Sequence, residues 1–207
     1  MRRRPGYWIA QVVVRGFAHL AFGLEATGRE HVPREGGFLL AANHNSYFDP
    51  PFLGGVLPRQ IRYFAKRQLF AIPGFSSLIR AYGAIPVDRE GADRRALADA
   101  LSLLARGEGL LVFPEGTRIR REGLAEPKAG IGLLAVRSGV PVVPAYIASS
   151  WEPRRRWHRR IPVRIRIGPP IHFPAEETGV PPRERYDAAA AAIMRAIDAL
   201  RPDPGAR

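Results

Sequence analysis

The chain has 207 residues, of which 46% are hydrophobic, so it is long and apolar enough for one substantial domain with a buried core. It contains no cysteine, which excludes disulfides, thiolate zinc sites and a cysteine nucleophile. The formal net charge is +13, and Lys66 and Lys128 are the only lysines. The positive charge is therefore almost entirely arginine, whose guanidinium can donate two parallel hydrogen bonds to phosphate oxygens. We expect a phosphate-bearing partner: nucleic acid, anionic lipid or a phosphorylated metabolite. The five histidines lack metal-ligand spacing, and we predict no bound metal.

The first predicted element is a helix over residues 7–24, which follows a short basic lead-in. Polar residues recur every four positions along one side of it and apolar residues fill the other side. Arg15 and His19 in mid-segment argue against a lipid-exposed span, whereas the aromatic residues at its start are typical of a membrane interface. We therefore expect an amphipathic interfacial helix within residues 1–27 and a domain over 28–207 that folds without this helix. The alternative is a helix that packs on the protein's own core.

An apolar run at residues 37–41 predicts a buried strand that leads into a polar loop containing His44 and Asp49. An imidazole can take a proton from an alcohol when a carboxylate fixes its tautomer and stabilises the imidazolium. No Gly-x-Ser-x-Gly elbow supplies a serine, so we expect the attacking hydroxyl to belong to the substrate. The alternative interpretation is a loop histidine bonded to a nearby aspartate for structural reasons.

The rest of the chain alternates strands and helices, which predicts an α/β fold with a mostly parallel central sheet covered by helices. Ligands of such folds bind at the carboxyl ends of strands, and His44, Arg89 and Arg118 each follow a predicted strand. Strands are predicted at 62–65, 84–87, 109–113, 141–147 and 163–167, and helices at 93–105, 128–138 and 185–200. A proline within 84–87 and strict alternation within 163–167 predict that these two strands lie near the margins of the sheet.

The densest positive charge lies at residues 154–160, where arginines flank Trp157. Arginines beside an indole suit anionic headgroups at a membrane surface, and they also suit single-stranded nucleic acid. A solvated loop is the third interpretation. No nucleic-acid-binding signature accompanies the cluster, so we expect an anionic membrane surface as partner and no nucleic acid.

Four separated stretches resemble, in order, the four motifs of the glycerolipid acyltransferases of the lysophosphatidate (1-acyl-sn-glycerol-3-phosphate) acyltransferase kind. These are Asn43-His44 with Asp49, Gly83 with Arg89, the Phe-Pro-Glu-Gly-Thr-Arg string at 113–118, and the Val-Pro-Val-Val-Pro string at 140–144. The string at 113–118 is the most specific of them. The resemblance implies transfer of a fatty acyl group from acyl-CoA or acyl-carrier protein to the hydroxyl of a lysophospholipid. The first acceptor it suggests is lysophosphatidate, which would become phosphatidate.

The same resemblance assigns roles to individual residues. His44 is implied as the general base and Asp49 as the group that orients and charges it, without an acyl-enzyme. Lys66 is a candidate donor to the oxyanion, with a surface lysine as the alternative. Arg89 and Arg118 are implied ligands of the acceptor phosphate. The other implied substrate-binding residues are Asn43, Glu115, Gly116 and Thr117.

Departures from the family pattern leave the acceptor open. Ile119-Arg120 follows the Thr-Arg pair where the family often has Ser-Arg, and residues 85–88 replace the usual aromatic and aliphatic pair. For Glu115 a salt bridge to an arginine is the alternative role. Another lysolipid acceptor, a nonenzymatic basic binding module and a thioester hydrolase are the alternative functions. We expect no cofactor, and a peripheral position on the cytoplasmic face of the cell membrane.

Overall fold

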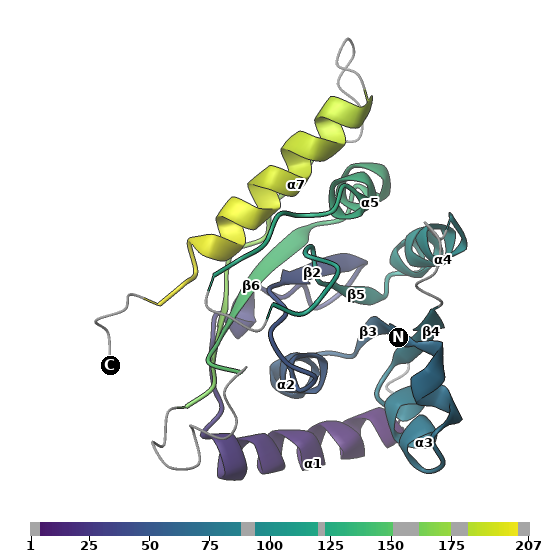
Figure 1. The fold of residues 1–207 in the computed structure, drawn as a ribbon, viewed down its shortest axis with the longest axis vertical. Helices are drawn as coiled ribbons and strands as arrows, with labels where there is room; N and C mark the ends of the chain where they lie inside the picture. The colour runs from purple at the N-terminus through teal and green to yellow at the C-terminus, as the bar shows by residue number, and fades with distance from the viewer. Residues whose placement is uncertain (1–4, 88–93, 120–122, 151–161, 175–181, 203–207) are drawn as a thin grey trace.

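The computed structural model describes residues 5–87, 94–119, 123–150, 162–174 and 182–202 (Figure 1). Its helices are α1 (Pro5–Phe22), α2 (Asp49–Val56), α3 (Phe75–Ala81), α4 (Arg94–Ala105), α5 (Gly130–Ser138) and α7 (Pro182–Asp198), with short 3-10 helices at Arg29–His31 and Arg67–Ala71. Its strands are β1 (Glu25–Thr27), β2 (Phe38–Ala42), β3 (Ile61–Lys66), β4 (Ala84–Val87), β5 (Gly109–Val112), β6 (Val142–Ala148) and β7 (Arg164–Ile167). Arg89 and the predicted cluster at 154–160 lie outside the described residues.

The strands form a seven-stranded sheet in the order β1-β7-β6-β2-β5-β3-β4. The strands from β6 to β4 pair in parallel, and β7 runs antiparallel to β6. The predicted α/β fold with a mostly parallel sheet is therefore confirmed. The strand with the internal proline, β4, is an edge strand, and β7 is next to the other edge, as the sequence predicted.

Helices cover both faces of the sheet, so that two cores form. In Figure 1, α1, α2 and α3 lie on one side and α4, α5 and α7 on the other. Strand β2 contributes to both cores because its side chains alternate: Phe38 and Leu40 pack into the first and Leu39 into the second. Every residue of β2 is fully buried. The polar loop after β2 therefore starts from the most enclosed strand of the sheet.

One side of helix α1 packs on the first core. The side-chain amide of Gln11 donates hydrogen bonds of 2.8 Å to the carbonyls of both Gly54 and Leu57, at the end of α2. The buried ring of Tyr7 stacks on Tyr82 with 5.2 Å between centroids, and burial raises the Tyr7 pKa to about 12. Residues 1–27 therefore include a helix that is integral to the packing of the domain.

The other side of α1 is apolar and exposed. Leu20 is 87% exposed and Val13 is 63% exposed, and Ile9, Trp8 and Phe17 are each more than half exposed. Among the described residues, no helix has both the length and the apolar character needed to cross a bilayer. The side of α1 that turns away from the core thus carries several large apolar residues.

Two helices were not predicted. Helix α2 begins at Asp49, and Pro50 and Pro51 occupy its first turn, where a proline loses no helical hydrogen bond. Helix α3 follows Gly74 and spans only seven residues, too short to show a clear apolar period. At the predicted 128–138 helix, the structure starts two residues later, at Gly130.

Candidate active site

Three adjacent parallel strands bring candidate residues to one edge of the sheet. β2 leads into Asn43 and His44, and its neighbour β5 leads into the loop of residues 113–118. β3, which pairs with β5, ends at Lys66. Because the strands are parallel, their carboxyl ends meet at the same edge, as the sequence predicted.

His44 and Asp49 form a buried hydrogen-bonded pair. Nδ1 of His44 lies 2.9 Å from Oδ2 of Asp49, and the side chains are 10% and 0% exposed. The backbone N–H groups of Asn45 and Ser46 donate to the same oxygen at 2.6 and 2.7 Å. A carboxylate only accepts, so Nδ1 carries the proton and the lone pair lies on Nε2. Nε2 has no hydrogen-bond partner among the described residues and remains available to a substrate proton.

Two further contacts orient His44. Its ring stacks on Phe113, with 3.9 Å between centroids and 16° between planes. Its backbone N–H donates a 2.9 Å hydrogen bond to Oε2 of Glu115. Both partners follow β5, so the loop after β5 sets the position and the tilt of the imidazole. Neither contact is evident from spacing in the sequence, because each joins residues about 70 positions apart.

Glu115 lies in the interior of this arrangement and is 3% exposed. Its Oε1 accepts the backbone N–H of Ala125 at 3.1 Å, while Oε2 accepts that of His44. Burial raises the pKa of the Glu115 carboxyl, and the two backbone hydrogen bonds lower it by less. No salt bridge to Glu115 is present within the described part of the chain. In this geometry Glu115 joins three loops.

Asn43 fastens the end of β2 to β6. Its amide oxygen accepts the N–H of Ile147 at 2.7 Å and its amide nitrogen donates to the carbonyl of the same residue at 3.0 Å. The side chain is 1% exposed. Asn45, in the amide orientation that its neighbours require, donates to the carbonyls of His44 and Ile119 at 3.2 and 3.1 Å. Both asparagines thus stabilise the His44 loop.

The segment 116–119 lies against the same loop. Gly116 has φ +67° and closes a tight turn through its N–H to the Phe113 carbonyl, 3.0 Å away. A Cβ at Gly116 would lie 2.7 Å from the flexible end of the Lys128 side chain, which can move aside, so the positive φ is what favours glycine here. The N–H of Ile119 donates to the His44 carbonyl at 2.7 Å. Arg118 therefore lies next to the loop that carries His44. The side chain of Thr117 is exposed.

Lys66 is exposed at the end of β3. One strand, β5, separates β3 from β2, so the two strand axes are about 10 Å apart at ordinary strand spacing. Arg89 follows β4 and is outside the described residues. Within those residues, no three His, Asp or Glu side chains are grouped to hold a metal ion.

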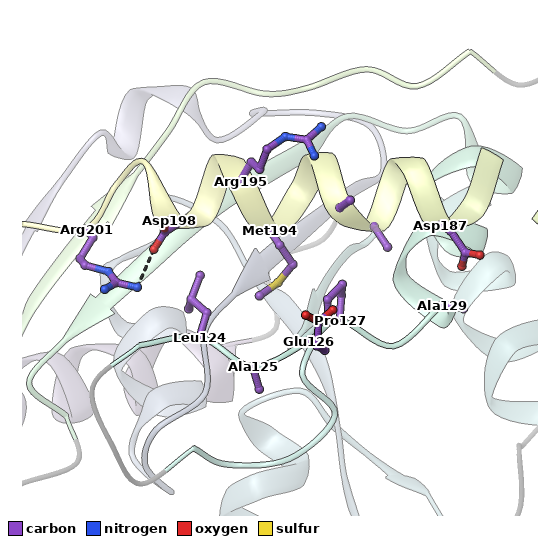
Figure 2. A pocket seen from close by; sticks show the side chains of 12 residues that line it. Leu124, Ala125, Glu126, Pro127, Ala129, Asp187, Met194, Arg195, Asp198 and Arg201 are labelled. Atoms are coloured by element: carbon purple, nitrogen blue, oxygen red, sulfur yellow. Dashed lines mark ion pairs between the residues drawn. The ribbon is translucent and has the colours of Figure 1, made fainter. Parts of the chain in front are cut away.

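A separate cavity of about 590 Å³ lies between α7 and residues 124–129 (Figure 2). Helix α7 covers the face of the sheet opposite α1 (Figure 1). Leu124 and Met194 line the apolar part of the cavity, and the ion pair between Arg201 and Asp198 lies at one end. His44 and Asp49 do not line this cavity.

The parallel sheet and the oriented histidine at its edge fit the enzyme class that the sequence motifs suggested. The chain belongs to the Acyltransferase family, whose model matches residues 23–148. The resemblance inferred from the four motifs is thus confirmed, and the protein is an acyltransferase.

Individual relatives carry more specific names. The 1-acyl-sn-glycerol-3-phosphate acyltransferase of Bacillus subtilis is 31% identical over 179 residues, which are 86% of this chain and 88% of that protein. The lyso-ornithine lipid O-acyltransferase of Pseudomonas aeruginosa is also 31% identical, over 71% of this chain and 54% of that protein. The crystal structure of the 1-acyl-sn-glycerophosphate (LPA) acyltransferase PlsC from Thermotoga maritima matches with a TM-score of 0.71. Its sequence identity is 26%, over 98% of this chain and 86% of that one.

Proposed function

We propose that this enzyme transfers a fatty acyl group from an acyl thioester to the free hydroxyl of lysophosphatidate and so produces phosphatidate. The observation that carries the proposal is the His44–Asp49 pair, with Nε2 unpartnered among the described residues and Arg118 on the adjoining loop. The B. subtilis relative, named for acylation of this acceptor, supports the same assignment over most of both chains.

In the proposed reaction, Nε2 of His44 accepts the proton of the acceptor hydroxyl while its oxygen attacks the thioester carbonyl carbon. The carbonyl oxygen becomes an oxyanion. Collapse of the tetrahedral intermediate breaks the carbon–sulfur bond, and the imidazolium returns its proton to the departing thiolate. Asp49 stabilises the imidazolium through Nδ1–H and keeps the tautomer fixed. General-base assistance of this kind contributes about 10²- to 10⁴-fold in rate.

Arg118 binds the acceptor phosphate in this proposal, together with Arg89, which follows β4 in the chain. Guanidinium groups are suited to this because they present paired donors to phosphate oxygens. Gly116 and Thr117 line the acceptor site beside Arg118. Lys66 is the proposed donor to the oxyanion, which requires its extended side chain to reach across the end of β5.

In this proposal Asn43 and Glu115 affect the substrate indirectly, by holding the loop that carries His44 in place. Their polar atoms bond to backbone groups of Ile147, His44 and Ala125. The donor is acyl-CoA or acyl-carrier protein, since both carry the acyl group on a thiol. A thiolate is a good leaving group, so the scheme needs no cofactor or metal.

The exposed apolar side of α1 is the proposed contact with the membrane that holds the lysophospholipid. Helix α1 is held to the core on one side by Gln11 and exposes large apolar residues on the other. Exposed apolar residues of this kind are typical of helices that lie at a membrane interface. Arginine-rich surfaces favour anionic headgroups. We therefore infer a peripheral enzyme on the cytoplasmic face, where soluble acyl thioesters are available.

A second acceptor is supported by a specific observation. The P. aeruginosa lyso-ornithine lipid O-acyltransferase is as identical to this chain as the B. subtilis relative, although over fewer residues. Such a lysolipid carries no phosphate. Measuring which of the two lysolipids is acylated therefore decides between the two proposals. The role of His44 as general base is the same in both.

The proposal is tested with purified enzyme, oleoyl-CoA and two parallel acceptors, lysophosphatidate and lyso-ornithine lipid. We expect phosphatidate from the wild type and none above background from His44→Ala. Competition by glycerol 3-phosphate should slow the reaction if the site binds the phosphate. Preferential acylation of lyso-ornithine lipid would replace the proposed acceptor, and equal activity of His44→Ala would overturn the mechanism. Acyl release at a comparable rate without acceptor would identify a hydrolase.

A further inference from the structure

The guanidinium of Arg118 lies over the ring of Tyr47. Its central carbon is 3.4 Å from the ring centroid, which is the distance of direct face-to-face contact. Tyr47 belongs to the loop between His44 and Asp49 and is 69% exposed. The side chain of Arg118 is therefore stacked on the loop that carries the proposed general base.

Stacking leaves the donors of Arg118 free. The N–H groups of a guanidinium point outward in its own plane, so a ring on its face blocks none of them. Among the described residues, Arg118 makes no hydrogen bond and no ion pair. Its main chain is held next to the same loop, because the N–H of Ile119 donates to the His44 carbonyl at 2.7 Å. Backbone and side chain of residue 118 are thus both positioned relative to His44, while its donors remain unused.

We propose that Tyr47 is a positioning residue that holds the plane of Arg118 for a phosphate monoester on the acceptor. The ring restricts a long, flexible side chain to one orientation before substrate binds, which lowers the entropy lost on binding. The inference rests on the proposed function of Arg118 as a phosphate ligand. The hydroxyl of Tyr47 has no hydrogen-bond partner within the described part of the chain, so the aromatic face is the part that acts.

The test compares Tyr47→Leu, which removes the aromatic face but keeps an apolar side chain, with Tyr47→Phe, which keeps the face. We expect Tyr47→Leu to raise the KM for lysophosphatidate about two- to fivefold, the range for an exposed cation–π contact, with kcat unchanged. Tyr47→Phe should match the wild type. Acylation of lyso-ornithine lipid, which has no phosphate, should show the same KM in all three proteins.

A second measurement does not depend on acyl transfer. Calorimetric titration with glycerol 3-phosphate should give a Kd raised by the same factor in Tyr47→Leu and unchanged in Tyr47→Phe. If the wild type fails to acylate lysophosphatidate, the proposed function fails, yet this titration still tests the link between Tyr47 and Arg118. An unchanged Kd and KM in Tyr47→Leu would overturn the inference. So would an equal KM rise for both acceptors, which would show that Tyr47 contacts the membrane, or an equal loss in Tyr47→Phe.

Discussion

The backbone N–H of His44 donates a 2.9 Å hydrogen bond to Oε2 of Glu115, which follows a different strand. The other oxygen of the same carboxylate accepts the N–H of Ala125 at 3.1 Å. The loop after β2 and two segments that follow β5 therefore meet on one buried carboxylate. Because the ring of His44 also stacks on Phe113, the loop after β5 controls where the imidazole sits.

Glu115→Gln should destabilise the protein and slow it. A glutamine presents an NH₂ group to one of two backbone N–H donors, so one buried donor loses its acceptor. We expect a loss of about 1–3 kcal/mol in the free energy of unfolding, measured by urea titration, and a lower kcat because His44 is displaced. Glu126→Gln is the control, since Glu126 is an exposed glutamate on the neighbouring segment. Equal effects of the two substitutions would contradict the role assigned to Glu115.

Glu115 should also leave a signature in the pH dependence of stability. Burial raises the pKa of its carboxyl above the ordinary 4.5, so the folded protein keeps this proton to a higher pH than the unfolded chain. The contribution of Glu115 to the free energy of unfolding therefore falls as the pH rises from 4.5 through the folded pKa, and is constant above it. Urea titrations of wild type and Glu115→Gln across this interval measure the contribution as a difference. If the difference in unfolding free energy between wild type and Glu115→Gln rises with pH, the two backbone hydrogen bonds lower the pKa of Glu115 by more than burial raises it.

Asp49→Asn should lower kcat about 10²- to 10⁴-fold, as we also expect of His44→Ala, because both remove the general base in its working tautomer. The asparagine amide can donate to Nδ1, which moves the imidazole proton to Nε2 and removes the lone pair that accepts the substrate proton. Initial rates of acyl transfer at saturating acceptor measure the effect. A variant that keeps at least half of the wild-type kcat would exclude this role for Asp49.

The two sides of α1 should respond differently to substitution. Val13→Glu places a charge on the exposed apolar face and should weaken co-sedimentation with anionic liposomes by about tenfold, with little change in stability. Gln11→Ala removes the donor to the carbonyls of Gly54 and Leu57 and should lower the unfolding free energy by about 1–2 kcal/mol. Unchanged liposome binding of Val13→Glu would remove α1 from the proposed membrane contact.

Deleting residues 1–24 should lower the stability of the protein as well as weaken its binding to membranes. The sequence suggested that the remaining domain would fold without them, but α1 covers Tyr82 with the ring of Tyr7 and packs along α2. We therefore expect a lower midpoint of urea unfolding for the truncated protein, in addition to weaker liposome binding. A midpoint equal to that of the full chain would show that α1 contributes nothing to the fold.

The local sequence was sufficient to predict every strand of the sheet except β1, which has only three residues. The predicted 84–87 strand is β4 residue for residue, and the runs at 37–41 and 109–113 fall within one residue of β2 and β5. These runs are apolar on both faces, a pattern that depends only on neighbouring residues. Helix α2 was not predicted because its two prolines are as typical of turns as of a helix start.

The arrangement of the site depended on the tertiary structure. His44, Asp49 and the Phe-Pro-Glu-Gly-Thr-Arg string could be recognised in the sequence, yet the contacts of His44 with Phe113 and Glu115 could not. Those contacts require the parallel register in which Ala41 lies opposite Val112. A slip of one residue would turn the side chains after β5 to the other face of the sheet. This register is set by the packing of both cores together. The residues of the candidate active site could therefore be recognised in the sequence, whereas their positions relative to one another could not.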